Sequence, residues 1–539
     1  MDGGRRVLAR RPGEQARGGP PAASHRTVTG SNTEQVAPSH DRGQGMSEYT
    51  SQQPVTDWGR MQSAPVRAVV HPADEEQLRR YVVGAVASGA KVSIRGIGHS
   101  AGGQSFCRGA VMIDMRHLKR VLEFDAGSRT IRVQAGASWA DLTPLLEVHG
   151  LSVTTKQEFD SFTLGGSIAA NVHGKTIEFG PLIESIQSLR LLRADGRIIN
   201  VSREENADLF PAVVGGYGLA GVVVDVTLAL ALDRVVEKSE VILMRSEPLC
   251  ASYIQRLKSP GERPALCYGF LDATCSQGFY VTYTHAHENG DGDLRHLKRN
   301  EPPPLLFNAF VWLQQRSKFA RDRAFQVMVH TASHSEQTLR SRRLLLWDDI
   351  PGAFDSMLLQ KYVVPVERFH EFTRAAGQIF ARYPELPLLT NHFRFVPGNS
   401  EALLALAPRD SICMIPCYLA RKDDARWVEK LALATHELLD AALALGGSYY
   451  LAFDTLATPE QFQRAYPKAK AFFALKRAHD PDETFSSFFY EKYGALSPLT
   501  KTGDVSSGGS VLLPKRNARQ LENSRGAALP PMLWRACWP

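Results

Sequence analysis

One histidine, His99, lies in a loop of glycines and other small residues, which reads RGIGHSAGGQ from Arg95 to Gln104. The loop follows a strand-like run, Lys91–Ile94. Glycine allows backbone conformations that other residues avoid, and it lets a ligand approach the main chain closely. The residue types therefore predict a ligand-binding loop, with His99 either beside the ligand or bonded to it.

Two more glycine-rich segments follow. One reads FTLGGSIAANVHG from Phe162 to Gly174, and the other reads GYGLAG from Gly216 to Gly221. Backbone N–H groups among such small residues can bind an anion. Turns and tight packing would explain the same glycines, so neither segment decides the function alone.

The glycine spacings at 96–101 and 216–221 match the dinucleotide-binding fingerprint. That fingerprint needs a following helix, because the helix N-terminus holds the pyrophosphate. The sequence after the first pattern continues as a loop, and Val222–Val226 after the second predicts a strand. We therefore expect neither to be a Rossmann site, which weakens the hypothesis of a nicotinamide dehydrogenase.

Short helices and strands surround these loops. Periodicity predicts helices over 75–88, 139–149, 366–380 and 424–445, and strands over 67–72, 91–94, 111–114, 130–135, 186–192 and 221–230. Elements lengthen after about Leu232. The sequence thus predicts an α+β fold with a domain boundary near this residue.

Composition places limits on the class of protein. The 539 residues carry a formal net charge of +7, much of it from arginines near the N-terminus, so we expect no nucleic-acid partner. Seven cysteines at scattered spacings predict reduced thiols in a cytoplasmic protein without a metal site. No apolar run approaches the ~20 residues that a membrane helix needs, and no signal peptide is recognisable.

The three glycine-rich segments, taken in order with their strands, resemble the FAD domain of the vanillyl-alcohol oxidase and p-cresol methylhydroxylase (PCMH) family over about Val66–Leu232. The resemblance implies a PCMH-type FAD-binding domain of two subdomains, followed by an α+β substrate-binding cap domain with a large antiparallel sheet. It also implies FAD contacts from these residues: Ile94, Arg95, Gly96, Ile97, Gly98, His99, Ser100, Ala101, Gly102, Gly103, Gln104, Thr163, Leu164, Gly165, Gly166, Ala170, Asn171, Val172, His173, Val222, Val223 and Tyr450.

The expected domains divide the chain into five parts. They are a disordered N-terminal extension at 1–55, the FAD domain at 58–232, the cap domain at 233–470, a C-terminal segment that packs back on the FAD domain at 471–496, and a disordered tail at 497–539.

Many members of the family carry a histidine at the position of His99 that is bonded to the 8α carbon of the flavin. By resemblance we expect FAD to be attached covalently through His99, although a histidine that only touches the flavin would fit the same motif. Bicovalent members add a cysteine before the second glycine-rich segment. Residues 158–161 contain none, so we expect no second bond.

Later motifs resemble the decaprenylphosphoryl-ribose oxidase subgroup, among them ANVHGK at 170–175 and GGSYYLAFDTLATPEQFQRAYP at 446–467. That subgroup has arginine in place of His99, glutamine in place of Lys361 and an active-site lysine in place of Phe453. These departures imply a different substrate. The GHS loop itself is closer to sugar-alcohol, aldonolactone and cytokinin oxidoreductases.

Catalytic candidates come from the cap domain. Flavin chemistry transfers a hydride from a substrate carbon to flavin N5, while the protein orients the C–H bond. By resemblance Tyr450 lies beside the flavin, and Lys361 and Arg394 lie on strands that face it. Both cations could equally be surface charges, and His173 could be purely structural. Cys413 falls near the pocket by resemblance, but a lone buried cysteine is usually inert.

The leading hypothesis is an FAD-dependent oxidoreductase, oxidase or dehydrogenase, that acts on a CH–OH group of a sugar, polyol or lactone and passes electrons to O2 or another oxidant. Oxidation of a CH–NH group, as in cytokinin dehydrogenases, is an alternative. A catalytically silent flavin-binding protein is another.

Overall fold

The computed structural model describes residues 54–494 apart from Glu158, 260–262, 287–308, 310–311, 335–337, 341–356 and 454–455. All of them belong to one compact unit of the chain, residues 49–539. The predicted extension at 1–55 and tail at 497–539 lie outside the described residues, except for residues 54 and 55.

The described chain opens with an antiparallel hairpin of β1 (Val55–Thr56) and β2 (Ser63–Ala64). A small parallel sheet follows in the order β3 (Ala68–Val70), β5 (Val111–Asp114) and β4 (Val92–Arg95). Parallel strands need a crossover connection, and α1 (Glu75–Ala87) supplies it between β3 and β4, the two outer strands of this sheet. Its apolar stripe is buried against this sheet, and η1 (Met115–His117) follows β5.

A six-stranded antiparallel sheet comes next, in the order β10 (Ile198–Ser202), β9 (Ile186–Leu192), β11 (Val222–Leu232), β7 (Thr130–Gln134) and β6 (Val121–Asp125), with β8 (Leu151–Val153) also paired to β11. The helices between its strands are α2 (Trp139–Val148), α3 (Leu164–Ala169), η2 (Leu182–Ser185) and α4 (Phe210–Val213). The capping box of Ser138 and Asp141 fixes the start of α2.

Nine strands form the largest sheet, in the order β15 (Thr338–Arg340), β12 (Val235–Arg245), β14 (Gln277–His285), β13 (Leu266–Leu271), β18 (Leu388–Val396), β19 (Ser411–Leu419), β17 (Tyr362–Pro365) and β20 (Ser448–Tyr449), with β16 (Met357–Leu359) also paired to β19. Every pairing in it is antiparallel. The prediction of an α+β chain with a large antiparallel sheet is confirmed.

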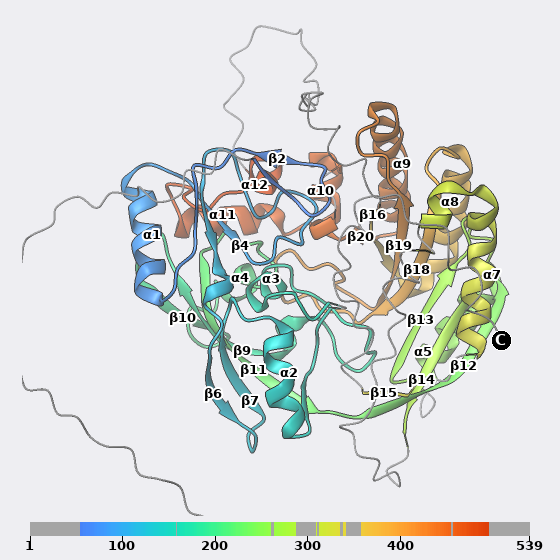
Figure 1. Cartoon of the computed structure of the whole chain (residues 1–539), viewed down its shortest axis with the longest axis horizontal. Coiled ribbons are helices and arrows are strands. Elements are labelled where there is room, and N and C mark those ends of the chain that lie inside the picture. Colours follow the sequence, from blue (N-terminus) through green and yellow to red (C-terminus); the bar gives the residue numbers. More distant parts are fainter. Residues whose placement is uncertain are drawn as a thin grey trace, which may run out of the picture. The chain divides into compact units, whose positions relative to one another are not determined.

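Helices cover both faces of this sheet (Figure 1). On one face lie α5 (Ser246–Lys258), α8 (Phe369–Arg382) and α9 (Ala425–Ala444), with η4 (Val366–Arg368) leading into α8. The other face carries α7 (Lys318–His334). Strand alternation explains the division, because Phe279 packs against Phe325 of α7 whereas Tyr280 packs against Tyr253 of α5.

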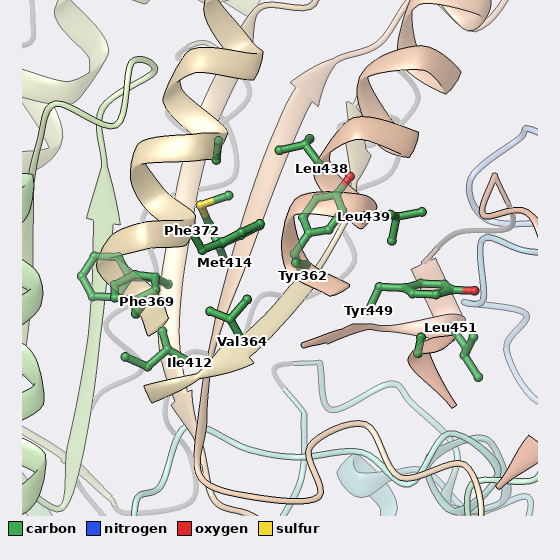
Figure 2. Packing of buried hydrophobic residues seen from close by; sticks show 14 of the residues in the cluster. Tyr362, Val364, Phe369, Phe372, Ile412, Met414, Leu438, Leu439, Tyr449 and Leu451 are labelled. Atoms are coloured by element: carbon green, nitrogen blue, oxygen red, sulfur yellow. The ribbon is translucent and has the colours of Figure 1, made fainter. Parts of the chain in front are cut away.

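The main core lies between the sheet and α8 and α9. Figure 2 shows Val364 of β17 and Met414 of β19 pointing toward Phe372 of α8, with Leu438 of α9 beside Tyr362. This core packs against one face of β17 and β19 and so fixes the position of these strands in the sheet.

The C-terminal elements are η5 (Leu451–Phe453), α10 (Pro459–Ala465), α11 (Ala469–His479) and α12 (Phe488–Tyr493). After α11 the chain runs alongside β4: Val92 N–H donates to Thr484 O at 2.7 Å, and Ser486 N–H donates to Val92 O at 3.0 Å. A buried ion pair, Lys476 Nζ to Asp480 Oδ2 at 2.8 Å, fixes this return. The segment therefore supports the strand that leads into the His99 loop.

Most predicted elements form within a few residues of their expected bounds, and β11 begins directly after Gly221 instead of a helix. Three details differ. The β1–β2 hairpin precedes Val66, where the resemblance to the FAD domain begins. Residues 164–169 form a short helix inside the second glycine-rich segment. Lys361 lies in the link between β16 and β17 and not on a strand.

Candidate functional site

A cavity of about 730 Å³ lies between the glycine-rich segments and one face of the nine-stranded sheet. All three segments contribute to its wall, together with β13, β14, β18 and β19 and residues of α7. Cofactor and ligand pockets commonly measure about 300–1,000 Å³. The cavity therefore has the volume of a site for a large ligand.

The first loop leaves β4 and turns directly into the cavity wall. Gly98 has φ +77°, a left-handed conformation that favours glycine. Gly96 faces Thr163 so closely that an added Cβ would lie 2.1 Å from Thr163 Oγ1. This contact joins the first glycine-rich segment to the second.

Hydrogen bonds hold the other end of this loop to η5. Ala101 N–H donates to Ala452 O at 2.8 Å, and the Gln104 side-chain amide donates to Leu451 O. Because Tyr450 immediately precedes η5, these bonds place it at the same cavity as the loop.

Aromatic rings enclose His99. Its ring stacks on Trp58 at 4.6 Å between centroids, and it lies 4.4 Å from Phe162 and 5.3 Å from Phe159. Burial lowers the pKa of His99 to about 3, since the charged imidazolium would lose its hydration. His99 is thus a neutral imidazole on the cavity wall at physiological pH.

In the second segment, part of the backbone is already hydrogen-bonded. Gly165 N–H donates to Ala135 O at 2.7 Å, and Gly166 N–H donates to Thr163 Oγ1 at 3.3 Å. These two glycines therefore serve close packing as well as the cavity wall, in agreement with the packing alternative raised by the sequence.

His173, at the end of this segment, meets Lys361 across 188 residues of sequence. Lys361 Nζ lies 3.1 Å from His173 Nε2, while His173 Nδ1 lies 3.3 Å from Gly174 O. A neutral imidazole satisfies both contacts, with Nδ1–H donating and Nε2 accepting. Burial, then the charges of Lys361 and Arg394, hold the pKa of His173 well below its usual range.

Lys361 and Tyr450 are brought together by the β17–β20 ladder. Tyr362 pairs with Tyr449, and Tyr450 N–H donates to Lys361 O at 3.0 Å. The Lys361 ammonium then lies 4.1 Å from the centre of the Tyr450 ring and 5.3 Å from that of Phe453. Burial raises the pKa of Tyr450 above its usual range, so its phenol keeps its proton and can donate a hydrogen bond.

Arg394 lies on β18, where it pairs with Tyr268 of β13 and Cys413 of β19. Lys361 and Arg394 are 5% and 4% exposed, so the alternative that they are surface charges is wrong. Among the described residues that line the cavity, none is aspartate or glutamate, whereas Arg95 and Lys175 join these two cations. The cavity is suited to an anionic ligand.

Most sequence-predicted residues meet in this one cavity. The lining includes Ile94, Arg95, Gly96, Ile97, Gly98, His99, Ser100, Gln104, Thr163, Gly165, Gly166, Ala170, Val172, His173, Val223, Lys361, Arg394 and Tyr450. Those that do not line it are Ala101, Gly102, Gly103, Leu164, Asn171 and Val222. Cys413 is also fully buried away from the cavity, although Cys417 on the same strand face lines it.

Sequence reasoning missed several lining residues. Trp58 is the first residue of the expected FAD domain and belongs to no motif. Phe159 precedes the second segment, and Phe162 is the first residue of that segment but was not among the expected contacts. Gln314, near α7, is 2% exposed, and its Oε1 is buried without a hydrogen-bond partner among the described residues. An unsatisfied buried amide in a cavity wall is suited to a donor group on a ligand.

The residues fit FAD. Gly96 and Gly98 pack so closely against the side chains of Thr163 and Arg95 that a Cβ would collide with them, so the loop presents its main chain at the cavity wall. The buried Arg95 Nε, on the lining, has no hydrogen-bond partner among the described residues and could donate to a phosphate oxygen.

Residues 66–202 match the family model of an FAD binding domain. This match and the relatives below confirm the predicted resemblance to FAD-linked oxidoreductases with a PCMH-type FAD domain, and they support an FAD-dependent oxidoreductase. In the described part of the chain, no helix is long and apolar enough to cross a membrane.

Three relatives illustrate the range of similarity. Decaprenylphosphoryl-β-D-ribose oxidase of Mycolicibacterium smegmatis is 27% identical over 471 residues, which cover 80% of this chain and 95% of the relative. L-Gulonolactone oxidase of Mus musculus is 31% identical over 32% of this chain and 39% of its own length. Cytokinin dehydrogenase 7 of Oryza sativa is 32% identical over 32% of this chain and 35% of its own length. The last two alignments span little more than a third of those relatives.

Proposed function

We propose that this protein oxidises a CH–OH group of a sugar, polyol or lactone, with FAD bound by the three glycine-rich segments and the substrate bound beside the nine-stranded sheet. The observation that carries the proposal is that Lys361, Arg394 and Tyr450 line the same cavity as the cofactor loops. When bound, the flavin accepts the hydride at N5 and passes the electrons to O2 or another oxidant.

The chain's own residues would orient the substrate. Lys361 and Arg394 bind an oxygen-bearing or anionic group of the substrate, because both cations are buried and line the cavity. The Tyr450 phenol donates a hydrogen bond beside them. His173 accepts a hydrogen bond from Lys361 and holds the Lys361 ammonium in place. Because the pKa of His173 is held low, the imidazole is a weak base and leaves the proton on Lys361.

The finer part of the proposal is covalent attachment through His99. A bond from an imidazole nitrogen to the 8α carbon replaces one N–H and one C–H. This replacement would release two protons and two electrons, and the oxidant that serves turnover would accept the electrons. The neutral state of His99 supports this role, because a protonated nitrogen has no lone pair to form the bond.

Oxidation of a CH–NH group is the second candidate, because cytokinin dehydrogenases match the chain as L-gulonolactone oxidase does. The chemistry of the wall favours the CH–OH proposal. Buried cations stabilise negative charge that develops on an alcohol oxygen, and they disfavour a cationic amine.

The test is anaerobic reduction of the purified holoprotein. We expect bleaching of the flavin absorbance by a polyol, aldose or lactone, and loss of that bleaching in Lys361→Gln with flavin content unchanged. Bleaching by amines alone would favour the CH–NH candidate, and reduction by dithionite alone would favour a silent flavoprotein. Protein without flavin after saturation with FAD would refute the proposal as a whole.

A further inference from the structure

The β1–β2 hairpin lies before the matched FAD domain, which begins at residue 66, yet it packs on the His99 loop. Trp58 N–H donates to Ser100 O at 3.1 Å. Gly59 approaches Ala101 so closely that an added Cβ would lie 2.9 Å from Ala101 Cβ. The hairpin is therefore bonded to the backbone on the C-terminal side of His99.

The Trp58 side chain continues this contact into the cavity. Its indole stacks on the His99 ring with an angle of 27° between the planes, and both residues line the cavity. Phe162 lies against the same imidazole at 55°. The two aromatic contacts leave the imidazole little freedom to rotate about χ2.

We propose that Trp58 is a positioning residue for His99: its indole fixes the imidazole in the orientation that attachment of the cofactor requires. The inference rests on the proposed covalent bond. It extends the cofactor site to a hairpin outside the domain that the family model covers.

Two physical effects support this role. Orientation matters because a misplacement of ~1 Å can slow a reaction by about 10²-fold. Indole also excludes water, and exclusion of water keeps the imidazole neutral, in agreement with the lowered pKa of His99. Without the indole, His99 would gain rotamers and hydration together.

The experiment compares full-length wild type with Trp58→Ala, Trp58→Phe and a hairpin control, Met61→Ala, whose side chain packs against a different cluster. Each protein is saturated with FAD, and total bound flavin is measured by absorbance. The protein is then precipitated with acid, and the flavin retained in the pellet is measured by absorbance and mass. Thermal unfolding reports whether the hairpin change affects folding.

We expect Trp58→Ala to bind flavin but to lose at least about tenfold in the covalent fraction formed per hour, with partial rescue by phenylalanine and wild-type attachment in Met61→Ala. Equal covalent fractions in wild type and Trp58→Ala would overturn the inference and leave the proposed function intact. Flavin that leaves the wild-type pellet would overturn both the bond and the role of Trp58. If Met61→Ala lost attachment as strongly as Trp58→Ala, the effect would belong to the hairpin fold and not to the indole.

Discussion

Asp57, in the same hairpin, holds a buried carboxyl that should make stability depend on pH. Its side chain is 3% exposed, and Oδ1 accepts from Met61 N–H at 3.0 Å and from Gln62 N–H at 3.4 Å. Burial raises its pKa from 3.8 to about 7, although these N–H groups and the charge of Lys422 act in the opposite direction. The carboxyl therefore prefers to be protonated in the folded state.

The sign follows from proton linkage. Between pH 4 and pH 7 the folded protein binds a proton at Asp57 that the unfolded chain does not, so stability falls as pH rises through this window. The full difference of about three pKa units corresponds to about 4 kcal/mol, and the slope is about 1.4 kcal/mol per pH unit. The substitution Asp57→Asn keeps the acceptor and removes the charge.

Urea unfolding of wild type and Asp57→Asn at pH 5, 6, 7 and 8 measures this effect. We expect the variant's advantage in free energy of unfolding to grow by about 2 kcal/mol from pH 5 to pH 7, by a few tenths of a kcal/mol more up to pH 8, and then to stay constant. The control is Asp125→Asn, an exposed carboxyl whose pKa is lowered by the Ser128 hydroxyl. A pH-independent difference for Asp57→Asn would refute the reasoning.

Three further predictions concern the support of the site. Gly96→Ala should reduce the flavin bound per protein and lower stability by about 1–3 kcal/mol, because the new Cβ collides with Thr163. The control Gly127→Ala, in an exposed turn, should match wild type in flavin absorbance and in thermal unfolding. Lys476→Met should lower the free energy of unfolding measured in urea by about 3–5 kcal/mol, because Asp480 would keep a buried charge without its ion-pair partner. Adding Asp480→Asn should restore part of the lost free energy of unfolding. A double variant no more stable than Lys476→Met would contradict this account. Burial raises the pKa of Cys417 to about 12, so a thiol reagent at pH 8 should label it only after denaturation; rapid labelling of the native protein would show that the cavity is open to reagents.

The sequence by itself determined the local features. Strand 111–114 has the predicted bounds and helix 75–87 ends one residue early, because alternation and helical periodicity are local signals. The glycine-rich loops were predicted for the same reason, since only certain residues accept their conformations. Their order along the chain was sufficient to indicate FAD, which the family match supports.

Only the tertiary structure decided which side chains meet. Lys361 lies beside Tyr450 because β17 pairs with β20 in one register, and it meets His173 only because the second glycine-rich segment packs against this end of the sheet. Trp58 has no local pattern that links it to His99, and its role depends on a hairpin folding over a loop some forty residues later. Contacts of this kind depend on the packing of distant segments, which periodicity and composition do not encode.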